Sequence, residues 1–102
     1  MGLFNRLSDF GDREQIRVHA YRIGIGIQQI KNESSLQTIK GLSIALQQEV
    51  QTMMMYASTL SQESINCLDV NYKGRKISFA RFLSDLRLES IEIVNRGGYN
   101  II

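Results

Sequence analysis

Cationic side chains gather in one stretch of this sequence, directly after a tyrosine. The members of this basic region are Tyr72, Lys73, Arg75, Lys76 and Arg81. Lysine and arginine bind phosphate oxygens, and a neighbouring aromatic ring can stack on a nucleic-acid base. This region is therefore a candidate nucleic-acid site, although such loops are more often simply solvated. It does not match a DNA-reading helix-turn-helix, whose connecting turn has about three or four residues.

Residues suited to acid–base or nucleophilic catalysis are sparse. His19 is the only histidine, so every Ser/His/Asp or Cys/His arrangement would have to use it, and no serine lies in a nucleophile-elbow context. Cys67, the only cysteine, lies on an apolar stripe, which predicts a buried and inert thiol. Glu49 and Glu63 have no carboxylate three or four positions later. We predict a protein that is not an enzyme and uses no metal ion or cofactor.

The composition is that of a soluble globular protein, with 43% hydrophobic and 22% charged residues. Its net charge of +2 is too small to concentrate polyanions by itself. A single cysteine excludes an intramolecular disulfide and fits a reducing compartment. No segment approaches the roughly 18 apolar residues that a membrane span requires. We expect a cytoplasmic protein whose residues 1–102 form a single helical domain.

The N-terminal third predicts two helices. Leu3, Phe4, Leu7 and Phe10 share one face of a short helix. Residues 8–12, which include Ser8, Gly11 and two aspartates, read as a turn, so a longer helix is expected from about Arg13. The longer helix carries an apolar seam at three- and four-residue spacing. The members of this seam are Ile16, Ala20, Ile23, Ile27 and Ile30.

Glycines complicate this helix. Residues 23–27 alternate isoleucine with glycine, which also suits a strand, and each glycine costs a helix about 1 kcal/mol relative to alanine. The seam continues on both sides and favours the helix, while the strand stays open. Ala20 and Gly24, four positions apart, would let a neighbouring helix approach closely.

Residues 34–60 form the longest periodic segment. A short polar link before it predicts that it runs antiparallel to the preceding helix. Its heptad seam includes several small side chains, which would admit bulky neighbours or a close backbone. The seam positions are Leu36, Ile39, Ser43, Leu46, Val50, Met53, Ala57, Leu60, Ser64 and Cys67.

More apolar residues lie off this seam than one neighbouring helix can bury. They are Leu42, Ile44, Met54, Met55 and Tyr56. The adjacent methionines suit adaptable contacts because their thioether side chains are flexible. We therefore predict that these five residues bind a partner, and a symmetric homodimer is the commonest way to bury such an excess.

The C-terminal part predicts a loop around Gly74 and then a third helix capped by Ser78. A short β-hairpin near residues 70–79 is the alternative to the loop, and residues 91–102 read either as a helix end near Asn95 or as a hairpin. Residues on one face of the third helix are predicted to be buried, with Arg81, Asp85 and Glu89 on an exposed face. The predicted buried face consists of Phe79, Phe82, Leu83, Leu86 and Ser90. The final isoleucines should dock on the core or pair with another chain.

Together these patterns predict an all-α protein, a long antiparallel helical hairpin with a third C-terminal helix. The leading functional hypothesis is a self-associating interaction module, such as an adaptor, a chaperone-like protein or a regulatory subunit, that binds another protein. The alternative is a dimeric nucleic-acid-binding accessory protein that uses the basic region.

Overall fold

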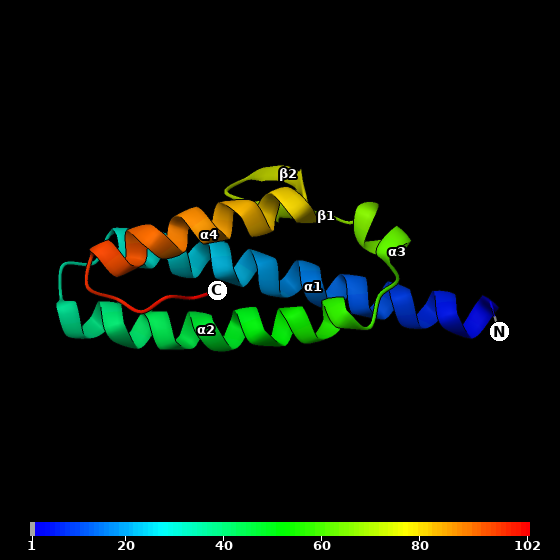
Figure 1. Cartoon of the computed structure of the whole chain (residues 1–102), viewed down its shortest axis with the longest axis horizontal. Helices are drawn as coiled ribbons and strands as arrows, with labels where there is room; N and C mark the ends of the chain where they lie inside the picture. Colours follow the sequence, from blue (N-terminus) through cyan, green and yellow to red (C-terminus); the bar gives the residue numbers. More distant parts are fainter. Residues whose placement is uncertain (1) are drawn as a thin grey trace.

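The structure is a helical hairpin with a smaller helical and β-hairpin layer packed on one side (Figure 1). The computed structural model describes the backbone of residues 2–102 and the side chains of residues 9–102. The elements are α1 (Gly2–Lys31), α2 (Leu36–Ser58), α3 (Gln62–Asn66), β1 (Asp69–Tyr72), β2 (Arg75–Ser78) and α4 (Phe79–Asn95). A tail, residues 96–102, follows α4. This confirms the predicted antiparallel helical hairpin with a third long helix at the C-terminal end, and the β-hairpin forms in the region where it was the alternative to a loop.

α1 is one continuous helix, so the predicted turn at residues 8–12 is wrong. The polar side chains that suggested a turn instead form hydrogen bonds with α3 and with the C-terminal end of α2. The Asp12 carboxylate accepts a hydrogen bond from Thr59 (2.6 Å), and the Asp9 carboxylate accepts one from Ser64 (2.8 Å). Of the predicted apolar face on the first turns, only Phe10 has a described side chain, and it is exposed.

The isoleucine–glycine segment is helical, as the continuous seam predicts. All five seam residues of α1 are fully buried. A Cβ on Gly26 would lie 2.5 Å from Leu46 Cδ2, so this glycine lets α2 approach closely. Gly24 instead faces β1, where a Cβ would lie 3.3 Å from Tyr72 Cδ1. The predicted close helix contact therefore exists, but Gly26 makes it and not Gly24.

The α2 seam is confirmed from Ile39 to Ala57, whose members are buried. Leu36, the first predicted seam residue, is exposed, so the prediction is wrong at the start of the helix. Ser35 caps the start of α2, and the helix ends at Ser58 rather than continuing through Cys67. Ser61 caps the separate short helix α3, which resets the helical phase. Cys67 consequently lies off the seam and is exposed, so its predicted burial is wrong.

Residues 69–78 form the β-hairpin rather than the loop. Tyr72 pairs with Arg75 across a two-residue turn whose residues Lys73 and Gly74 have φ values of 54° and 74°. Positive φ at both positions is typical of the type I′ turn that tight hairpins favour. Val70 and Tyr72 point to the same side and are buried, which attaches the hairpin to the core.

α4 begins at its Ser78 cap and ends at Asn95, as predicted. The chain then reverses at Gly97, with φ of 99°, and the tail runs back between α2 and α4 (Figure 1). The alternative hairpin over residues 91–102 does not form. Ile101 is buried, which confirms that this end of the sequence docks on the core.

Candidate functional site

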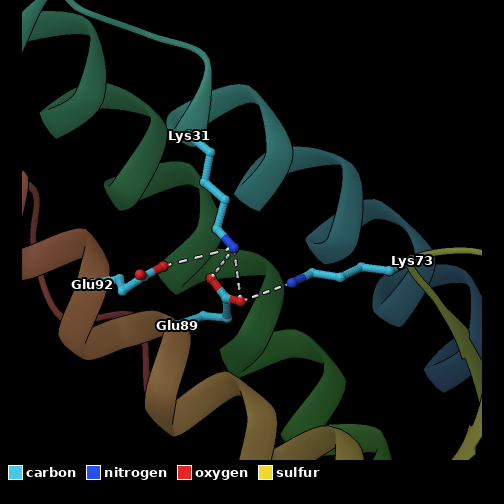
Figure 2. Close-up of polar contacts among 4 residues, drawn as sticks. All are labelled: Lys31, Lys73, Glu89 and Glu92. Atoms are coloured by element: carbon cyan, nitrogen blue, oxygen red, sulfur yellow. Dashed lines mark hydrogen bonds and ion pairs between the residues drawn. The ribbon is translucent and has the colours of Figure 1, made fainter.

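A charged cluster links α1, the β-hairpin turn and α4 (Figure 2). Lys31 Nζ lies 2.9 Å from the carboxylate oxygens of Glu89, and Lys73 Nζ donates to the same carboxylate at 2.8 Å. Lys31 Nζ also lies 3.7 Å from Glu92. The Glu89 side chain is only 12% exposed, so its predicted position on an exposed face is wrong. The pattern identified the correct helix face, but the hairpin turn and the end of α1 cover it.

The ionisation of this cluster follows from its contacts. Burial alone would raise the pKa of Glu89, but the hydrogen bonds from Lys73 and Lys31 outweigh it and leave that pKa below its ordinary value. The bond to Glu89 raises the pKa of Lys73. Burial, and then the nearby Glu89 charge, raise the pKa of Tyr72, whose buried hydroxyl has no hydrogen-bond partner in the described part of the chain. At neutral pH Glu89 and Lys73 are therefore both charged beside a neutral phenol.

The basic region does not act as one cationic surface. Tyr72 is buried with its ring edge-on to Phe82 at 5.1 Å between centroids, and Lys73 is paired with Glu89. Arg75, Lys76 and Arg81 are exposed. The groove between β2 and α4, about 260 Å³ in volume, is lined by Arg75 and Arg81 but also by the carboxylates of Asp85 and Glu89. Three exposed cationic side chains therefore remain that could bind a phosphate, and acidic side chains lie beside them.

His19 lies in the packing between α1 and α2. It is buried, its Nδ1 is hydrogen-bonded to Glu49, and its ring stacks on Tyr56 at 5.9 Å between centroids. Arg22 NH1 lies 3.9 Å from the same glutamate. These contacts give the single histidine a role in packing.

The five predicted partner-binding residues do not form one surface. Leu42 and Tyr56 are half-buried against the core. Ile44, Met54 and Met55 are exposed, and only the two methionines line a groove beside the tail. The surplus apolar side chains predicted on α2 therefore fall into two groups. Leu42 and Tyr56 cover α1, and the other three face outward.

A contiguous apolar surface forms where the tail passes between α2 and α4. Two open grooves, about 840 Å³ and 360 Å³, meet along the tail and share Asn100 and Ile102 in their linings. Val50 and Ile101 in these linings are buried, and the other large apolar side chains that line the grooves are between 38% and 70% exposed. We call this surface the tail face, and its members are Met54, Met55, Ile91, Val94 and Ile102. Sequence reasoning missed Ile91 and Val94, although their spacing off the buried face of α4 was a visible signal.

Two side chains hold the tail from opposite sides. Gln47 Nε2 in α2 donates to the Asn100 carbonyl at 2.7 Å. Ser90 in α4 donates to the Asn100 side-chain oxygen and accepts from the Ile101 amide at 2.9 Å. We call Gln47 and Ser90 the tail clamp. Only the Ser90 position was visible in the sequence, as part of a buried face.

Comparison with other proteins gives this chain no relative. The chain matches no protein-family model, no curated protein and no solved structure. Among the side chains from Asp9 onward, no three histidine, cysteine or acidic residues lie close enough together to hold a metal ion. None of the described helices has the length and apolar character needed to cross a membrane.

Proposed function

We propose that the protein is a non-enzymatic interaction module that forms a homodimer through the tail face and serves as a small helical adaptor or regulatory subunit. The observation that carries this proposal is the tail face itself, where five exposed apolar side chains from three segments line two grooves that share Asn100 and Ile102. Contiguous apolar patches of this kind usually mark interaction sites on soluble proteins. Two methionines among them suit contacts that must adapt to the partner.

Charge favours a second copy as the partner. Among the described residues that line the two grooves, Arg87 has the one charged side chain, and the others are apolar or neutral. The cores of protein interfaces are depleted of charge in the same way. Two tail faces can therefore meet about a two-fold axis without opposing like charges.

Light scattering with variants on and off the tail face tests the dimer. The wild-type protein should have about twice the monomer mass of 11.6 kDa at micromolar concentrations. Met55→Glu and Ile91→Glu should each weaken dimerisation at least tenfold, because a carboxylate would be buried in an apolar interface. Ile25→Glu is the matched control, since Ile25 is similarly exposed but lies on α1 away from the tail face. A wild-type monomer up to millimolar concentration would contradict the proposal.

A further inference from the structure

The tail is bound in the way that a peptide is bound by a recognition groove. Gln47 holds a main-chain carbonyl, and Ser90 holds both a main-chain amide and the asparagine side chain. Ser90 itself is almost completely buried, as is the Ile101 side chain that follows the clamped asparagine. Main-chain hydrogen bonds supply affinity in such grooves, and side-chain pockets supply specificity.

The tail lies between α2 and α4, which make few direct contacts with each other among the residues that the structure describes. At Gly98 the tail backbone lies directly on the groove floor, because a Cβ there would come within 2.5 Å of Ser43 Oγ and 2.7 Å of Ile93 Cγ2. The small seam residue Ser43 thus makes room for a close backbone, as the sequence predicted.

Few contacts hold the tail in the groove. The tail has no regular secondary structure, it is joined to α4 through Gly97 and Gly98, and Tyr99, Asn100 and Ile102 are exposed. Segments with few buried contacts open at a small fraction of the global unfolding free energy. One buried side chain and the clamp bonds are the main contacts to be lost.

We infer that the groove between α2 and α4 is a peptide-recognition site, and that the tail is its intramolecular occupant. The external ligand is an extended segment of a partner protein in which asparagine is followed by a branched aliphatic residue. Such a segment can reproduce the bonds to the tail clamp and the burial of Ile101. This inference rests on the proposed function, since it names what the same face recognises.

The test uses the full chain and a peptide in trans. The probe is a fluorescein-labelled peptide with the sequence of residues 96–102, and the matched control peptide has alanine at the asparagine position. Asn100→Ala with Ile101→Ala in the chain releases its own tail and leaves the tail clamp intact. If circular dichroism shows that this double variant loses helix, Asn100→Ala alone replaces it, because Asn100 is exposed.

The released chain should bind the wild-type peptide in fluorescence anisotropy, and the control peptide at least tenfold more weakly. The wild-type chain should bind the wild-type peptide at least tenfold more weakly than the released chain, because its tethered tail competes at a local concentration of about millimolar. Failure of the folded, released chain to bind, or equal binding of both peptides, would overturn the inference. Peptide binding by the dimer alone, with none by the monomeric Met55→Glu variant of the released chain, would place the binding site between two copies and overturn its assignment to the groove of one chain.

This inference and the homodimer can fail separately. Met55→Glu in the released chain should remove self-association, and the resulting monomer should still bind the wild-type peptide in preference to the control peptide. Peptide binding by a protein that is always monomeric would contradict the homodimer alone. A dimer that dissociates with Met55→Glu but binds no peptide would contradict the peptide site alone.

Discussion

Glu89→Gln removes the charge at the centre of the cluster that joins three elements. The glutamine keeps the shape of the side chain but leaves Lys31 and Lys73 facing a neutral amide. Because these lysines come from the end of α1 and from the β-hairpin turn, the substitution weakens the attachment of both to α4. The expected result is a loss of stability without a change of fold.

The expected loss of stability depends on how deeply Glu89, Lys31 and Lys73 are buried. Hydrogen bonds to buried charged groups contribute about 1.5–3 kcal/mol, whereas exposed ion pairs contribute about 0–1 kcal/mol. Glu89 is 12% exposed, but Lys31 and Lys73 are 27% and 40% exposed, so solvent screens part of the interaction. We expect Glu89→Gln to lower the free energy of unfolding by about 2 kcal/mol, which corresponds to about 10 °C in Tm for a domain of this size.

Urea denaturation followed by circular dichroism measures this loss, and Glu92→Gln is the control. Glu92 lies on the same helix and 3.7 Å from the same lysine, but it is 62% exposed. Its substitution should change the free energy of unfolding by less than about 0.5 kcal/mol. Equal effects of the two substitutions would refute the reasoning, because burial would then not decide the strength of the interaction.

The same cluster predicts a dependence on pH. The pKa of Glu89 is lower in the folded protein than its ordinary value of 4.5, so the unfolded chain takes up the proton first as the pH falls. The contribution of Glu89 is therefore fully present above that value and is lost as the pH falls through the folded pKa. The pKa of Lys73 is raised above 10.5, so its share is lost only at higher pH. The stability difference between wild type and Glu89→Gln should thus be constant near neutral pH and shrink in acid, and a difference that persists unchanged to about pH 2 would contradict this.

Three further substitutions test the packing in the same unfolding assay. Gly98→Ala should lower the free energy of unfolding by about 1–3 kcal/mol, because the new Cβ would overlap Ser43 Oγ. Gly41→Ala should raise it by about 0.5–1 kcal/mol, because Gly41 lies within α2 at an exposed position and nothing lies within 4 Å of its Cβ position. If the two glycines respond alike, the close approach of the tail to α2 is wrong. Tyr72→Phe removes a buried hydroxyl that has no hydrogen-bond partner among the described side chains, so the free energy of unfolding should stay level or rise by about 1 kcal/mol. A marked loss would reveal a partner for this hydroxyl.

The long helices were predictable because their seams repeat over many turns. The seam through Ile23 and Ile27 outweighed two glycines, since fully buried isoleucines on both sides compensate for the low helix propensity of glycine. The N-terminal turn was mispredicted because Asp9 and Asp12 resemble turn residues locally. Their side chains bind α3 and the end of α2, and no local pattern shows that contact.

The candidate site was less predictable because its contacts join segments far apart in the sequence. The spacing of Arg81, Asp85 and Glu89 defines one face of α4 but not what covers that face. Lys31 reaches Glu89 across 58 positions, and Asn100 reaches Gln47 across 53. Likewise, the count of off-seam residues on α2 showed a surplus without showing that Tyr56 covers His19 while Met55 faces outward.

The tail couples the two proposed interactions. Ile101 fills the groove and the next residue, Ile102, belongs to the tail face, so a segment that replaces Ile101 must also move Ile102. Peptide binding and dimerisation through this face therefore change each other's affinity, and by linkage the factor is the same in both directions. If the dimer holds the tail in its groove, dimerisation lowers the affinity for the peptide, and the peptide lowers the affinity of dimerisation equally. Dimer affinity measured with and without the peptide must then agree with peptide affinity measured for monomer and dimer.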